Sequence, residues 1–186
     1  MQEKDADIVT IQETKVIEAG SQDILKISNY NHYALPAKEE PAAKRGKKKK
    51  GGKSGGLVTY VHKKHDSVLK GKLDNKGGQH ITVEVFLNNG QTINVTNSYR
   101  KHVERKIKEE ATDFITNAIN AGSNVNHFIL GDMNGESLKW GDRENAAGKA
   151  IDEKLTEEFY LTYNNGEITR LGGRTEEDTA IRYYSR

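Results

Sequence analysis

Two polar side chains that suit metal or phosphate chemistry follow a short apolar run in the third quarter of the sequence. Residues 128–130 are typical of a buried strand, Gly131 ends the run, and Asp132 and Asn134 come next. In layered α/β folds, ligands and metals bind at strand ends. Gly, Asp and Asn are also ordinary turn residues. Taken alone, this stretch predicts either a turn or a ligand-binding strand end.

Two further polar groups lie at the ends of other predicted strands. Val9 and Ile11 alternate in a strand predicted over residues 7–13, and Glu13 falls in phase with them. The alternation predicts a carboxylate carried inward, whereas the plainer interpretation is an exposed glutamate at a strand end. Tyr99 closes another alternating apolar run, where a core tyrosine is the default interpretation.

Composition sets the class of molecule. The chain has 186 residues, 34% of them hydrophobic and 30% charged, which predicts one domain with long polar loops. We expect no membrane span, since every apolar run is far shorter than the roughly 20 residues that a helical span needs. The polar, acidic start is unlike a secretory signal. With no cysteine there are no disulfide partners and no thiolate chemistry, and an intracellular protein is the simplest expectation.

The positive charge is concentrated in one segment. Seven lysines and arginines lie between Lys44 and Lys53, and removing them from a net charge of +2 leaves −5. Residues 36–56 are rich in Lys, Gly, Ala and Glu, which predicts a flexible insert in the single domain 1–186. The basic run is typical of a nuclear localisation signal or a phosphate-binding patch, and equally of a solvated loop without a partner. Its charges would attract nucleic acid in a salt-dependent manner.

The remaining pattern alternates strands with two helices. A hairpin turn is predicted at 88–90, and a helix over 103–119 with Gly122 as its C-cap. A second helix is predicted to begin after Asn145, with its buried face at Ala147, Ile151, Leu155 and Phe159. This mixture indicates sheets packed between helices. Further strands are predicted at 30–35, 57–62, 66–72, 81–87, 93–99, 160–163 and 180–184.

Several short motifs occur in an order that resembles a known superfamily. The principal ones are Ile11-Gln12-Glu13-Thr14, Asn97-Ser98-Tyr99 and Gly131-Asp132-Met133-Asn134; the others are the Gly-Gly-Leu-Val-Thr-Tyr-Val strand at 55–61, Leu138-Lys139-Trp140-Gly141, Asn145-x-x-Gly148 and Thr169-Arg170. Together they resemble the endonuclease/exonuclease/phosphatase superfamily. The resemblance is strongest to the endonuclease domains of non-LTR (LINE-type) retrotransposons.

The resemblance implies a fold, a reaction and a set of roles. The implied fold is an α/β four-layer sandwich, and the implied reaction is Mg²⁺-dependent (or Mn²⁺-dependent) nicking of duplex DNA. Glu13 would be the metal ligand and Asp132 would activate the water. Asn134 would bind the scissile phosphate, while Tyr99 would stabilise the charge of the transition state. Thr169 and Arg170 would contact the DNA backbone, with a surface loop as the alternative.

The chain also departs from the superfamily pattern. The family's first strand, with its Asn, and its final Asp-His pair have no counterpart here, so we expect a domain incomplete at both ends. Arg182 stands where the family's Ile-Asp-Tyr strand carries an acid. It would pair with the phosphate, with Asp132 or with Glu13, or it marks sequence decay.

Two alternative functions remain. One is a catalytically dead remnant that binds nucleic acid through the Lys44–Lys53 segment. The other is a phosphatase of the same superfamily acting on a phosphorylated small molecule or lipid, and the Trp140-Gly141 and Asn145-x-x-Gly148 pattern favours the transposon branch over it.

Overall fold

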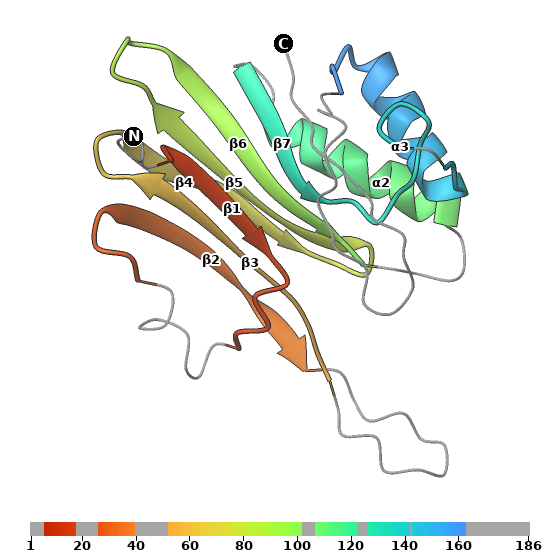
Figure 1. Ribbon diagram of the computed structural model, residues 1–186, viewed down its shortest axis with the longest axis horizontal. Coiled ribbons are helices and arrows are strands. Elements are labelled where there is room, and N and C mark those ends of the chain that lie inside the picture. Colours follow the sequence, from red (N-terminus) through yellow and green to blue (C-terminus); the bar gives the residue numbers. More distant parts are fainter. Residues whose placement is uncertain are drawn as a thin grey trace.

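Two β-sheets packed face to face form the body of the molecule, and helices cover one outer face (Figure 1). The computed structural model describes residues 6–17, 26–39, 52–101, 107–122, 126–141 and 143–162. The first sheet has the order β1-β3-β2, with neighbours antiparallel. Its strands are β1 (Ile8–Gln12), β2 (Tyr30–Glu39) and β3 (Lys53–His62).

The second sheet has the order β4-β5-β6-β7. Its strands are β4 (Asp66–Asp74), β5 (Gly78–Phe86), β6 (Thr92–Arg100) and β7 (Asn126–Asp132). The β5–β6 hairpin turns where it was predicted, at residues 88–90. β6 and β7 are parallel, so the chain must cross over between them, and it does so through α2 (Ile107–Asn120). The predicted α/β class with two packed sheets and helices is confirmed.

An apolar core fills the space between the two sheets. It is built from every second residue of β3 and of β5. Successive residues of a strand point to opposite faces of its sheet, so every second residue points into this core. Tyr99 closes this core at one end, and Ile8, Tyr33 and Leu35 pack against it from β1 and β2. Its other fully buried members are Leu57, Val61, Ile81, Val83 and Val85.

A second core lies between the second sheet and the helices, with α3 (Ala146–Glu157) packed on α2. The predicted N-cap of α3 is confirmed, because the Asn145 Oδ1 atom accepts a bond of 2.8 Å from the Gly148 amide. Ala147, Ile151 and Leu155 are buried as predicted. Phe159 is not: it lies past the helix end and is 90% exposed.

The predicted insert and one predicted strand differ from the structure. The predicted flexible insert at 36–56 was too wide, since Ala37 pairs with Gly55 and Glu39 with Lys53 in the β2–β3 ladder. Residues 160–162 form no strand, and 180–184 lie outside the described residues.

Among the described helices, none is long and apolar enough to cross a membrane.

Candidate active site

Glu13 lies just past the end of β1, and the predicted basis for its inward direction was wrong. Ile8 packs into the core between the sheets, whereas Ile11 is exposed on the other side of β1. In β1 the residues in phase with Ile8 therefore face the core, and not those in phase with Ile11 as predicted. Glu13 itself has a φ of 55°, so the chain has left the extended conformation and strand alternation no longer fixes where its side chain points.

Two glycines at the start of the apolar part of β3 hold the segment that carries Glu13. The Thr14 and Lys15 amides donate to the carbonyls of Gly56 and Gly55, each at 3.1 Å. Both glycines have positive φ, and a Cβ on Gly56 would overlap the Thr14 hydroxyl. Glycine is thus required here by conformation and by close contact.

Tyr99 joins Glu13 to the second sheet. Its ring is 7% exposed and belongs to the core between the sheets, so the core interpretation is correct. Its hydroxyl nevertheless reaches the solvent-facing end of that core and donates to the Glu13 carboxylate. The same Glu13 oxygen, Oε1, also pairs with the Lys15 ammonium at 2.7 Å.

A buried amide bridge fixes the two sheets next to this contact. The Gln12 Nε2 atom donates to the Asn97 Oδ1 atom at 2.7 Å. The Asn97 Nδ2 atom in turn donates to the carbonyls of Val58, at 2.9 Å, and Ile11, at 3.2 Å. Asn97 is fully buried and its amide is satisfied on both sides, which rigidly links β1 and β3 to β6.

Asp132 and Asn134 stand beside Tyr99. In the parallel β6–β7 ladder Tyr99 is the partner of Asp132, and register partners project to the same face of a sheet. The chain turns after Asp132: the Asp132 Oδ1 atom accepts from the Asn134 amide at 3.0 Å, and Asn134 has a φ of 44°. Gly131 permits the close approach to β6, because a Cβ there would overlap the Ser98 carbonyl.

Arg100 holds the other side of this turn. Its guanidinium Nη1 atom donates to the Asn134 carbonyl at 3.0 Å, and the Asn134 side-chain Nδ2 atom donates to the Arg100 carbonyl at 2.6 Å. Burial lowers the pKa of Arg100, and the charges of Glu110 and Asp132 oppose that shift. Nothing in the sequence motifs singled Arg100 out, although it directly follows Tyr99.

The structure therefore brings together four of the predicted site residues: Glu13 and Asp132 on either side of Tyr99, with Asn134 in the turn. The other three, Thr169, Arg170 and Arg182, lie outside the described residues. All four supply oxygen atoms, the donor type that Mg²⁺ prefers. No group of three acidic or histidine side chains forms a metal cage within the described ranges. One exposed carboxylate is compatible with a hydrated Mg²⁺, which keeps several of its waters.

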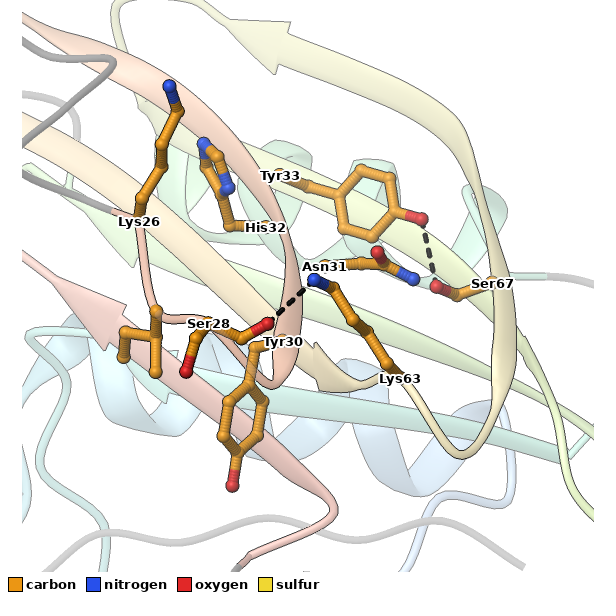
Figure 2. Close-up of a pocket in the computed structure, with 9 residues that line it drawn as sticks. Lys26, Ser28, Tyr30, Asn31, His32, Tyr33, Lys63 and Ser67 are labelled. Atoms are coloured by element: carbon orange, nitrogen blue, oxygen red, sulfur yellow. Dashed lines mark hydrogen bonds between the residues drawn. The ribbon is translucent and has the colours of Figure 1, made fainter.

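A separate open groove lies at the opposite end of the sandwich (Figure 2). Lys26, His32, Lys63 and Ser67 are among its lining residues, and none of the four predicted site residues that the structure describes is among them. Figure 2 shows the Lys63 ammonium directed at the Ser28 carbonyl, and the Tyr33 hydroxyl directed at Ser67. The groove is therefore not part of the candidate active site.

The chain belongs to the Endonuclease/Exonuclease/phosphatase family, whose sequence model matches residues 1–181. The described geometry is in keeping with this family, which is generally dependent on divalent metals. No curated protein matches the chain at a significant level.

Solved structures show the same fold at low sequence identity. The endonuclease domain of TRAS1, a telomere-specific non-LTR retrotransposon, aligns with a TM-score of 0.54 and 14% identity; the alignment covers 83% of this chain and 67% of that one. TDP2 from Caenorhabditis elegans aligns with a TM-score of 0.50 and 16% identity, covering 96% and 54%. This chain thus spans about two thirds and one half of these two structures.

Proposed function

We propose that this chain hydrolyses phosphodiester bonds and nicks duplex DNA, as a retrotransposon endonuclease does, with Mg²⁺ as its metal. One observation carries the proposal: Tyr99 connects the Glu13 carboxylate to the strand end that bears Asp132. These residues lie on three separate strand ends, and their polar groups meet where the core between the sheets ends. The structural likeness to the TRAS1 endonuclease domain supports the choice of DNA.

The roles follow from the positions of the side chains. Asp132 orients and deprotonates the attacking water, and its own carboxylate is fixed by the Asn134 amide at 3.0 Å. Tyr99 presents a hydroxyl to the negative charge that develops on the phosphate. Glu13 would hold the Mg²⁺ ion, which supplies charge neutralisation at the phosphate when bound. One N–H of the Asn134 side-chain Nδ2 atom donates to the Arg100 carbonyl at 2.6 Å, and the second N–H would donate to the scissile phosphate.

A plasmid-nicking assay tests this proposal. We expect nicking that requires Mg²⁺ and is lost in Asp132→Ala and Glu13→Gln. The matched control is Asp113→Asn, which changes an exposed acid on α2 and leaves the site untouched. Nicking that is insensitive to Mg²⁺, or equal in Asp132→Ala and Asp113→Asn, would exclude the proposed chemistry.

A second candidate function is DNA binding without cleavage. It is favoured by the ion pair between Lys15 and Glu13, because the ammonium occupies the carboxylate that a metal would need. Its DNA contacts would come from the basic residues between Lys44 and Lys53. Lys15→Met separates the two ideas. If the pair only competes with the metal, this substitution lowers the Mg²⁺ concentration needed for nicking; if the protein is a binder, nicking stays absent while salt-sensitive binding persists.

A further inference from the structure

Arg100 is a charged residue in a place where charge is costly. It is 2% exposed, and burial of an unpaired guanidinium would be strongly unfavourable. It follows Tyr99 on β6, so its side chain points to the opposite face of the sheet, toward the helices. It therefore cannot reach a substrate bound next to Tyr99.

Two hydrogen bonds join Arg100 to the turn that presents Asp132, while its charge also lies near Glu110 of α2. The Arg100 guanidinium donates to the Asn134 main-chain carbonyl. In return, the Asn134 side-chain amide donates to the Arg100 main-chain carbonyl, so two hydrogen bonds join these residues. Asn134 adopts the left-handed conformation, which Asn takes more readily than other non-glycine residues. Its bonds to Arg100 and to the Asp132 carboxylate hold the turn in this conformation.

We propose that Arg100 is a positioning residue that fixes the Asp132–Asn134 turn in its working geometry from the far side of the sheet. The inference rests on the proposed nuclease function and adds a residue to it. The Asn134 main-chain amide donates to the Asp132 carboxylate and orients it. Loosening the turn therefore moves the carboxylate that activates water. A misplacement of about 1 Å at a reacting group can cost on the order of 10²-fold in rate.

The guanidinium is needed rather than the charge alone. A planar fork makes directional bonds to main-chain oxygen, whereas a lysine ammonium is a flexible point charge with a shorter reach. Arg100→Lys thus keeps the charge that faces Glu110 and Asp132 but loses the bond to the Asn134 carbonyl. Arg100→Met loses both.

The test compares Arg100→Lys and Arg100→Met with Val83→Ala, a core variant in the layer between the sheets that lowers stability without touching the turn. We expect kcat for plasmid nicking to fall about 10- to 100-fold in both Arg100 variants, with KM for DNA within about two-fold of wild type. Val83→Ala lowers Tm but leaves kcat unchanged. An Arg100→Lys variant with wild-type kcat, or a loss no greater than that of Val83→Ala, would overturn the positioning role.

A second readout works without activity. In a ¹⁵N-labelled protein the Asn134 side-chain amide resonances report the bond to the Arg100 main-chain carbonyl. Because Arg100→Lys loosens the turn, we expect these resonances to shift in Arg100→Lys but not in Val83→Ala. If wild-type protein nicks no DNA, the proposed function fails while this shift still supports the link between Arg100 and the turn. Unmoved resonances would overturn the inference even in an active enzyme.

Discussion

The two faces of the second sheet have the same strands but opposite chemistry. The face toward the first sheet is apolar along β5, with Ile81, Val83 and Val85 fully buried, and becomes polar toward its open end, where Asn97 and Tyr99 lie. The face toward the helices carries a buried polar chain instead. Its members are Tyr160, His127, Thr96 and Thr82, joined in that order by bonds of 2.6, 2.7 and 2.8 Å, with His80 bonded separately to Ser98 at 2.9 Å.

The difference shows where each kind of polar group is tolerated. Glu13 is charged and lies at an edge open to water, where a cation and a phosphate could reach it. His80 and His127 are kept neutral near pH 7, because burial lowers the pKa of both to about 4. Neither histidine approaches Asp132 or Glu13 through any bond described, so the helix-facing layer supports the fold and the opposite layer ends in the candidate site.

The largest effect we expect is the loss of stability in acid. The folded-state pKa of His80 and His127, about 4, is below the ordinary 6.5, so between these values the unfolded chain binds more protons. The free energy of unfolding is therefore highest above pH 6.5 and falls as the pH drops toward 4, by about 3 kcal/mol for each histidine. Urea denaturation across this range measures the fall. His127→Gln should remove its share of the slope, and an unchanged slope would show that His127 does not cause it.

The next effect separates the site from its supporting layer. Tyr99→Phe keeps the buried ring and removes only the hydroxyl that contacts Glu13. We expect kcat for nicking to fall about 10²- to 10³-fold, because one hydroxyl aimed at developing charge is worth that much, with a Tm change of only a few degrees. The paired control is Tyr160→Phe, which removes a hydroxyl from the helix-facing chain and should leave kcat unchanged. Equal kcat losses in the two variants would mean that neither face is specialised.

How much of this was predictable depends on the range of the interactions. The strand end at Asp132 and Asn134 was predictable because the apolar run, the glycine and the polar pair are adjacent in sequence. The face of Glu13 was not, since alternation stops where φ becomes positive at that residue. Gly122 was predicted as a helix cap, yet it is buried where a Cβ would overlap the His127 ring, a contact that only tertiary packing reveals.

The role proposed for Arg100 could not be predicted from the sequence, because its contacts also depend on tertiary packing. A long cationic side chain after a strand reads as solvent-exposed, and here it folds back under a turn 34 residues away in the chain. The buried polar chain through Thr96 is similar, because Asn94, Thr96 and Ser98 carry no apolar signal that would mark their face of β6 as covered. Periodicity reports burial of apolar groups and is silent on satisfied polar ones.

A smaller effect is expected from breaking the buried chain at its centre. His127→Phe fills similar space but leaves the Tyr160 hydroxyl without the partner that it has at 2.6 Å. We expect the free energy of unfolding to fall by about 1–3 kcal/mol, the usual cost of stranding a buried polar group. Urea denaturation at pH 8 measures this free of histidine protonation. Nicking at that pH should be unaffected, and a loss of kcat larger than the loss of folded protein would connect this layer to the chemistry.

The smallest effect we expect is a change in the free energy of unfolding that has opposite signs in the helix-facing layer and in the layer between the sheets. Thr82 and Thr59 are both buried, but the Thr82 hydroxyl bonds to Thr96 at 2.8 Å, whereas the Thr59 hydroxyl has no hydrogen-bond partner among the described residues. Valine has nearly the shape of threonine, so each substitution tests the hydroxyl alone. Thr82→Val should cost about 1 kcal/mol, because it removes a bond. Thr59→Val should be neutral or stabilising by a similar amount, because it removes a buried group that nothing satisfies. If both variants lose stability equally, then Thr59 has a partner in the folded protein and the layer between the sheets is less purely apolar than its geometry indicates.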